Sequence, residues 1–129
     1  MMPDPLLQAA LDARENAFAP YSKFKVGAAI EGIDGRIHTG CNVENATYGL
    51  TMCAERVAVF KAVSEGARRF KRVAIAADTD KLTPPCGSCR QILWEFCGDV
   101  EIILVNLRGR IEIYRLRELF PKPFDGTFL

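Results

Sequence analysis

Three cysteines and one glutamate have residue types and spacing suited to a catalytic metal site. Cys86 and Cys89 stand three residues apart at the predicted start of a helix, so both thiols can converge on one ion. Cys53 opens another predicted helix, and a helix start favours thiolate over thiol. Catalytic zinc commonly keeps three protein ligands and leaves its fourth position for water. The pattern therefore predicts one Zn²⁺ per chain, bound by Cys53, Cys86 and Cys89.

Glu55 lies two residues after Cys53 and is the carboxylate best placed to move a proton of the water that the metal activates. Side chains two residues apart point to nearly opposite sides of a regular helix. Both can approach the ion only if Cys53 stands at or before the first helical turn. On that condition, the sequence predicts Glu55 as the catalytic acid and base.

Arg56 follows Cys53 by three residues, which places the two side chains on one face of a helix. Three thiolates on Zn²⁺ leave a net negative charge, and that charge makes a bound water less acidic. A guanidinium that donates hydrogen bonds to the thiolates withdraws part of the charge. The alternative is an exposed arginine on a solvated helix.

A Cys-x-x-Cys motif is also typical of a redox pair or of a structural zinc module. The redox pair predicts a reversible disulfide between Cys86 and Cys89, and the structural module predicts a fourth protein ligand. Cys97 lies eight residues beyond Cys89, about 12 Å along a continuous helix, which is too far to share the ion. The other residues of interest receive structural interpretations: Cys41 as a buried thiol, His38 as a surface or edge residue, and Trp94 as a core residue.

The whole chain has the size and composition of one globular domain, residues 1–129. Its formal net charge is +1, without the basic stripe of a nucleic-acid binder. No apolar run approaches the ~20 residues of a membrane-spanning helix, and the N-terminus lacks the basic segment of a signal peptide. Five cysteines in such a chain indicate metal binding before disulfides. We expect a cytoplasmic protein that binds neither nucleic acid nor membrane.

Helices and strands alternate along the chain and must position these residues. Asp4 and Pro5 start a predicted helix over residues 5–18, which Pro20 ends. Asp34-Gly35 is a turn signal between two strands of a hairpin. This order predicts an α/β fold with a single mixed five-stranded sheet between helices. The remaining predictions are strands over 25–31, 36–41, 72–77, 101–105 and 111–114, and helices over 53–65, 87–96 and 116–120.

Two segments around the predicted ligands, TMCAER and PPCGSCRQIL, resemble the cytidine deaminase family in its short form with three cysteine ligands. PYSKFKVGAA, GCNVENATYGL and the closing aromatic tail are similar to the same family in the same order. The resemblance runs from about Tyr21 to the C-terminus. It implies a three-layer fold, a Zn²⁺ cofactor, and hydrolytic deamination of free cytidine and deoxycytidine in pyrimidine salvage. It also implies a homotetramer whose sites borrow residues from neighbouring subunits.

The resemblance further implies roles for individual residues. Glu55 would deprotonate water, protonate N3 of the pyrimidine and help ammonia to leave, and Arg56 would withdraw charge from the thiolates. A carboxylate such as Glu44 beside the sugar accepts hydroxyl hydrogen bonds but repels a phosphate, which favours a nucleoside. Contacts mainly to the 3′-hydroxyl would admit deoxycytidine, and a cytosine-containing antibiotic nucleoside is the nearest alternative substrate. The implied contacts are Asn42 and Glu44 on the ribose, Phe24 on the base, the backbone of Ala54 and of the Cys86 region on the polar groups of the pyrimidine, and Tyr48 and Phe128 (or Phe124) near a neighbouring subunit's site.

Overall fold

Five strands and four helices make up the computed structural model, which describes residues 2–129. They form one mixed sheet with strand order β2-β1-β3-β4-β5, in which β3 and β4 are parallel and the other neighbours antiparallel. The elements are α1 (Pro5–Arg14), β1 (Val26–Gly32), β2 (Ile37–Cys41), α2 (Ala54–Ser64), β3 (Phe70–Ala77), α3 (Gly87–Cys97), β4 (Glu101–Val105), β5 (Ile111–Arg115) and α4 (Leu116–Leu119), with short 3₁₀ turns at Tyr48–Leu50 and Gly126–Phe128.

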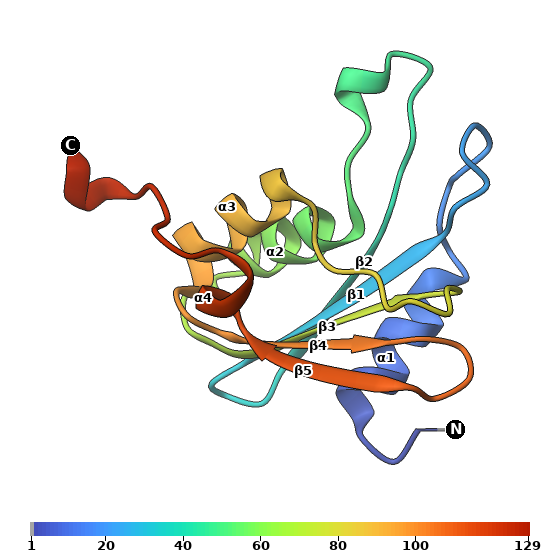
Figure 1. The fold of residues 1–129 in the computed structure, drawn as a ribbon, viewed down its shortest axis with the longest axis horizontal. Helices are drawn as coiled ribbons and strands as arrows, with labels where there is room; N and C mark the ends of the chain where they lie inside the picture. Colours follow the sequence, from blue (N-terminus) through green and yellow to red (C-terminus); the bar gives the residue numbers. More distant parts are fainter. Residues whose placement is uncertain (1) are drawn as a thin grey trace.

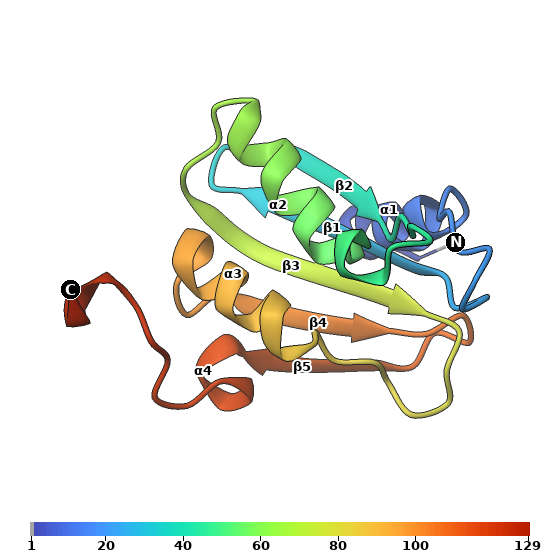
Figure 2. The same ribbon diagram turned by 90° about the horizontal axis from the view of Figure 1, so that it is seen from above.

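Helices cover both faces of the sheet, so the molecule has three layers (Figures 1 and 2). On one face, α1 packs its Leu6 and Ala10 against the small side chains of β1 and β3 such as Ala74. On the other face, α2 and α3 lie side by side over the alternate residues of β3, including Val73 and Ile75. This arrangement confirms the predicted α/β class, the mixed five-stranded sheet and the three layers.

Gly40 of β2 lets the start of α2 approach the sheet closely. A Cβ at this position would stand 2.6 Å from the carbonyl oxygen of Ala54 and 2.5 Å from the backbone nitrogen of Ala58. Any larger side chain would therefore push the first turn of α2 away from β2. The absence of a side chain at Gly40 thus helps to fix the place of Cys53, which immediately precedes α2.

The predicted helix over 5–18 is too long, because α1 ends at Arg14. Phe18 instead has extended backbone and pairs with the segment around Val43. Its N–H donates to the Asn42 carbonyl at 3.0 Å, and its carbonyl accepts from Glu44 N–H at 2.9 Å. Long-range backbone pairing therefore overrides the helical periodicity of this stretch. It also holds the loop after α1 to the loop after β2, and both loops carry predicted site residues.

The other predicted elements are present, with ends that differ by at most two residues.

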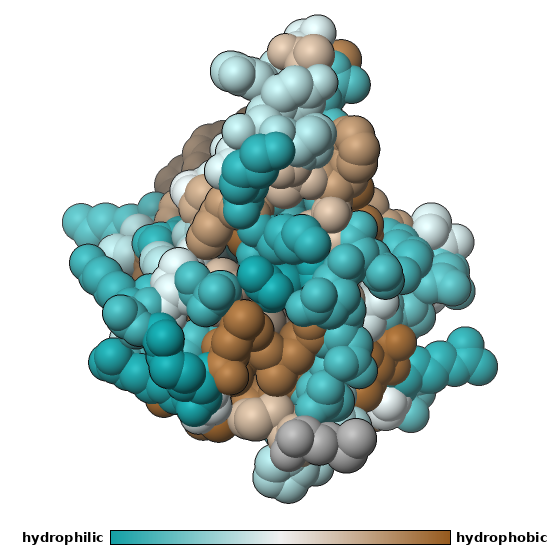
Figure 3. Space-filling model, turned by 90° about the vertical axis from the view of Figure 1, so that its right-hand side faces the viewer, coloured by the Kyte–Doolittle hydropathy of each residue, from teal (hydrophilic) through white to brown (hydrophobic). Residues whose placement is uncertain are grey.

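No helix in residues 2–129 is long and apolar enough to cross a membrane. In the view turned from Figure 1 to show its right-hand side, hydrophilic side chains surround smaller hydrophobic areas (Figure 3).

Three residues that received structural interpretations lie at the margins of the core. His38 is on the edge strand β2, where its ring is largely covered and its Nδ1 lies 2.9 Å from Glu65 Oε1. Cys41 is half-buried, not fully buried, and burial raises the pKa of its thiol. Trp94 packs against the core, as predicted, and its indole N–H also donates to Asp125 Oδ2 at 3.0 Å.

Candidate active site and metal centre

Two helix starts bring three cysteines together. Cys53 and Cys86 are the N-cap residues of α2 and α3, each with extended backbone, and Cys89 lies in the first turn of α3. The three Sγ atoms all lie within 4.8 Å of one another. The structural condition for Glu55 is met, because Cys53 stands just before the first turn of its helix.

The cluster contains three sulfur ligands in the part of the chain that the structure describes. Neither Cys41 nor Cys97 joins it, and all five cysteines are free thiols. Three soft sulfur donors on rigid helix starts fit a Zn²⁺ ion and leave one coordination position for water. Cys53, Cys86 and Cys89 are thus the residues that would hold the metal.

The sulfurs of Cys53 and Cys89 are joined by a hydrogen bond. Hydrogen bonds from Cys89 and from Arg56 to the Cys53 sulfur lower the pKa of Cys53 to about 5. The pKa of Cys89 is raised, because its proton is held against the Cys53 sulfur and the thiol is buried. Since metal ligands must be thiolates, a dication would replace this shared proton.

Arg56 lies against the cluster on the first turn of α2. Its Nη2 donates to Cys53 Sγ at 3.3 Å, and its buried Nε has no hydrogen-bond partner among the described residues. The positively charged guanidinium therefore lies in hydrogen-bond contact with one of the three sulfurs. Charge donated by three thiolates to a metal would be partly withdrawn at this contact.

Glu55 is the second residue of α2 and is 5% exposed. Burial is the main reason that the pKa of its carboxyl rises to about 7, and the negative charge on Cys53 adds to the effect. A carboxyl that titrates near neutral pH can both accept and release a proton under physiological conditions. Glu55 therefore has the protonation properties of a general acid and base.

A cavity of about 190 Å³ joins these groups to the predicted substrate contacts. Glu55 and two of the three thiols line it together with Phe24 and Glu44. The residues that line it are Ser22, Phe24, Val26, Asn42, Glu44, Thr51, Cys53, Ala54, Glu55, Thr83, Pro84 and Cys86. Of these, Ser22, Val26, Thr51, Thr83 and Pro84 were not among the sequence predictions, although Ser22 lies within the PYSKFKVGAA segment and Thr83 and Pro84 directly precede the Cys-x-x-Cys motif.

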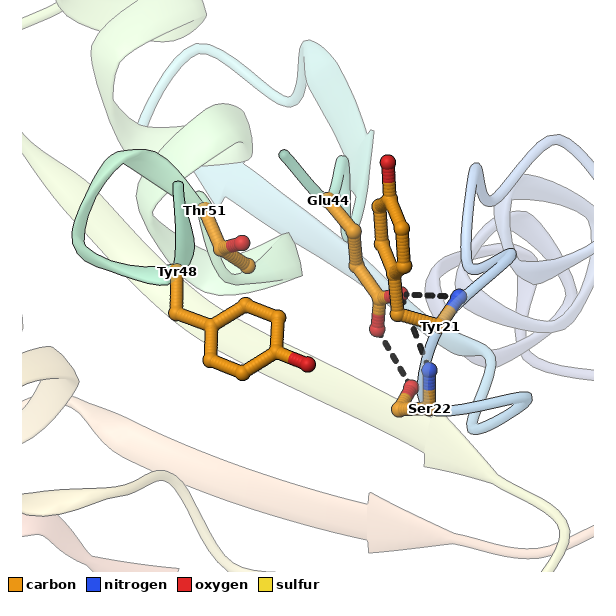
Figure 4. A pocket seen from close by; sticks show the side chains of 5 residues that line it. All are labelled: Tyr21, Ser22, Glu44, Tyr48 and Thr51. Carbon is orange, nitrogen blue, oxygen red and sulfur yellow. Dashed lines mark hydrogen bonds between the residues drawn. The ribbon is translucent and has the colours of Figure 1, made fainter. Parts of the chain in front are cut away.

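A second cavity, of about 400 Å³, adjoins the first and shares Ser22, Glu44 and Thr51 with it (Figure 4). Tyr21 and Tyr48 form its aromatic walls, with ring centroids 6.3 Å apart. It contains none of the metal ligands, so the reaction centre lies in the smaller cavity. Tyr48 therefore lies at the outer edge of the site.

Asn42 is buried, and both ends of its amide already hold the backbone. Its Oδ1 accepts from Val26 N–H at 2.9 Å, and its Nδ2 donates to the Phe24 carbonyl at 2.7 Å. One N–H and one lone pair stay free for a ligand. Asn42 can therefore contact a sugar and fix the Phe24 backbone at the same time.

Phe128 does not lie in either cavity of its own chain. Its ring stacks on Phe124 with a centroid distance of 5.5 Å, and both rings are exposed. Figure 1 shows that the C-terminal segment leaves α4 and points away from the sheet. Within one chain, the structure brings together all the other predicted site residues.

Comparisons with known proteins agree with this geometry. The family model described as "Cytidine and deoxycytidylate deaminase zinc-binding region" matches residues 3–105. A cytidine deaminase from Sporosarcina psychrophila is 50% identical over 121 residues, which cover 93% of this chain and 89% of the relative. A blasticidin-S deaminase from Bacillus cereus is 29% identical over 108 residues, covering 78% of this chain and 76% of that protein.

Solved structures show the same likeness. The crystal structure of a cytidine deaminase from Burkholderia pseudomallei aligns with a TM-score of 0.91 and 44% sequence identity, over 96% of this chain and 100% of that one. Fold, cysteine cluster and sequence therefore lead to one conclusion: the chain belongs to the cytidine and deoxycytidylate deaminase family of zinc-binding enzymes.

Proposed function

We propose that this protein catalyses the zinc-dependent hydrolytic deamination of free cytidine and deoxycytidine to uridine and deoxyuridine, with release of ammonia. One observation carries the proposal. A single cavity is lined by the buried Glu55, by two thiols of the cysteine cluster, by an aromatic ring, Phe24, and by a carboxylate, Glu44. An aromatic ring suits a pyrimidine base, and a carboxylate suits a sugar hydroxyl.

In the proposed reaction, Glu55 moves the protons. A Zn²⁺ ion held by Cys53, Cys86 and Cys89 would supply the Lewis acid that brings the pKa of a water molecule close to neutrality. Glu55 accepts a proton from this water as its oxygen adds to C4 of the pyrimidine, and then gives the proton to N3. Glu55 next accepts the remaining proton of the hydroxyl added at C4 and passes it to the departing amine. The C4–N4 bond then breaks, ammonia leaves, and the C4 carbonyl of the product forms.

The start of α2 is suited to read the pyrimidine. The first N–H groups of a helix have no partner within the helix, and Ala54, the first residue of α2, lines the cavity. We assign its backbone N–H to the pyrimidine carbonyl and the backbone around Cys86 to the exocyclic amine. Glu44, which would repel a phosphate, favours a nucleoside over a nucleotide.

The test combines metal analysis with turnover. Zinc per chain is measured, and the ultraviolet absorbance of cytidine is followed with the wild type and with Glu55→Ala. We expect about one zinc per chain in both proteins and turnover only in the wild type. If the zinc-loaded wild type leaves cytidine unchanged but converts a cytosine-containing antibiotic nucleoside, the antibiotic nucleoside and not cytidine is the substrate.

We also propose that the enzyme acts as a cytoplasmic homotetramer in pyrimidine salvage. The exposed aromatic rings support the assembly: Tyr48, at the edge of the site, is 76% exposed and Phe128 is 69% exposed. Light scattering and activity measured over a dilution series test it. Full activity of a monomer would contradict sites that are shared between subunits.

A further inference from the structure

The Tyr21–Phe24 loop is organised around the hydroxyl of Ser22. Ser22 Oγ donates to Glu44 Oε2 and accepts from Phe24 N–H at 3.0 Å. One hydroxyl therefore joins the proposed base contact, Phe24, to the proposed sugar contact, Glu44. Between them, Lys23 has a positive φ of 62°, and its N–H donates to the Ala19 carbonyl at 3.0 Å.

Glu44 already uses most of its capacity to accept hydrogen bonds. Its Oε1 accepts from the backbone N–H groups of Tyr21 at 3.0 Å and Ser22 at 3.1 Å, and its Oε2 accepts from Ser22 Oγ (Figure 4). A carboxylate offers about four lone-pair positions, two on each oxygen. Three are occupied, so about one position on Oε2 is left for a ligand.

Ser22 and Glu44 both line the cavity, so the carboxylate that carries the remaining position is accessible from it. A single acceptor can satisfy a single hydroxyl. Since deoxycytidine is part of the proposed substrate range, that hydroxyl must be one that both nucleosides carry, which excludes the 2′-hydroxyl and leaves the 3′- and 5′-hydroxyls. Of these two, the 3′-hydroxyl is the one that the resemblance implies. The direction of the free lone pair depends on Ser22, because the serine occupies its partner position on the same oxygen.

We propose that Ser22 is a positioning residue that orients the Glu44 carboxylate, so that its one free acceptor position receives the 3′-hydroxyl of the nucleoside. This inference rests on the proposed deamination of cytidine and adds a determinant of sugar recognition to it. The hydrogen bonds from Ser22 are also the main reason that the pKa of Glu44 is lowered, which keeps the carboxylate ionised and accepting.

The experiment measures kcat and KM of the wild type, Ser22→Ala and Ser22→Thr with cytidine, 2′-deoxycytidine and 3′-deoxycytidine. We expect Ser22→Ala to raise KM for the two substrates with a 3′-hydroxyl about tenfold, as expected for one hydrogen bond to a charged group, with kcat within about twofold. The preference for cytidine over 3′-deoxycytidine should fall by the same factor. Ser22→Thr retains the hydroxyl and should restore most of the wild-type KM.

Two further variants separate positioning from a general loss of structure. In a Glu44→Gln background, Ser22→Ala should add less than about twofold, because a residue that acts through Glu44 has no further effect once Glu44 is changed. Ser64→Ala is the matched control: its hydroxyl donates only to the Lys61 carbonyl, on α2 and outside both cavities, and its kinetics should equal those of the wild type.

Each contrary result has its own meaning. Equal loss of kcat/KM by Ser22→Ala with cytidine and with 3′-deoxycytidine would overturn the role of Ser22 in sugar recognition. The same holds for full additivity with Glu44→Gln, or for a fall in zinc content or melting temperature that accounts for the loss. A wild type without turnover of cytidine would instead overturn the proposed function itself.

Discussion

The residues that line the small cavity form two groups, here called the metal wall and the nucleoside wall, and the chain builds them differently. The metal wall comes from the starts of α2 and α3: Ala54 is fully buried, Glu55 is 5% exposed, Cys53 is half-buried and Cys86 is exposed. The nucleoside wall comes from loops, and its Phe24 ring is 41% exposed. The loops are held to each other by backbone pairing of Phe18 with Asn42 and Glu44.

The difference separates chemistry from recognition. Groups on helix starts are fixed before substrate arrives, which is what a metal ion and a proton carrier require. Exposed loop residues still have apolar surface to bury against a ligand or a second subunit. Changes on the metal wall should therefore act on zinc and kcat, and changes on the nucleoside wall on KM.

Removal of a ligand should have the largest effect. Cys89→Ala takes away the buried sulfur of the cluster, and the remaining two thiols cannot hold the ion. We expect less than about 0.1 zinc per chain, no detectable turnover, and a melting temperature several degrees below that of the wild type. Zinc analysis and thermal unfolding measure this.

Cys97→Ala is the matched control, because Cys97 is also a cysteine of α3 but lies outside the cluster. It should keep its zinc and its turnover. Loss of metal from Cys97→Ala as well would break the assignment of the metal wall to three cysteines.

Glu55→Gln should separate proton transfer from metal binding. The amide keeps the shape of the side chain but cannot carry a proton between water and the pyrimidine. We expect kcat to fall by about 10²–10⁴-fold, the usual contribution of a general acid and base, with zinc content unchanged. Steady-state kinetics and metal analysis of the same sample test it, and a loss of zinc would make Glu55 a ligand.

Arg56→Gln should have an intermediate effect. The variant removes the donor that lies 3.3 Å from Cys53 Sγ and leaves more negative charge on the sulfurs. We expect a loss of about 10–100-fold in activity or zinc affinity, as for other groups that hydrogen-bond metal ligands. Arg68→Gln is a suitable control, because Arg68 lies beyond the end of α2 and donates to the backbone carbonyls of Val63 and Ala67, far along the chain from the cluster. An effect confined to KM would contradict the proposed role.

The same comparison explains how much the sequence predicted. The metal wall depends on short spacings within two helices, so Cys53, Glu55, Cys86 and Cys89 could be assigned from local pattern. The end of α1 could not, because the periodicity of residues 15–18 is local while the pairing of Phe18 with Val43 is not. Ser22 was missed for the same reason, since its partner Glu44 lies 22 residues away in the chain.

Phe24→Ala should affect the nucleoside wall alone. The ring supplies contact area to the base and touches no metal ligand in the proposed reaction. We expect KM for cytidine to rise about 3–10-fold, the range of one aromatic contact, while kcat and zinc content change little. Phe24→Leu should lie between the wild type and Phe24→Ala, since it keeps apolar area without the ring. A large fall in kcat would show that the two walls are not separable.

Substitutions in the C-terminal tail should have the smallest effect on KM, and they test whether one subunit contributes to the nucleoside wall of another. Phe128 and Phe124 stack on each other and are both exposed, so neither ring is buried against the rest of its own chain. If the tail completes a neighbouring site, Phe128→Ala should raise KM about 2–5-fold, the value of a single exposed aromatic contact, without affecting zinc. Phe124→Ala is the comparison variant, because it removes the stacking partner four residues earlier in the chain. Both variants are compared by kinetics over a dilution series. A greater rise of KM with Phe124→Ala would assign the contact to Phe124. An unchanged KM in both variants would show that the tail of a neighbouring subunit does not contribute to substrate binding.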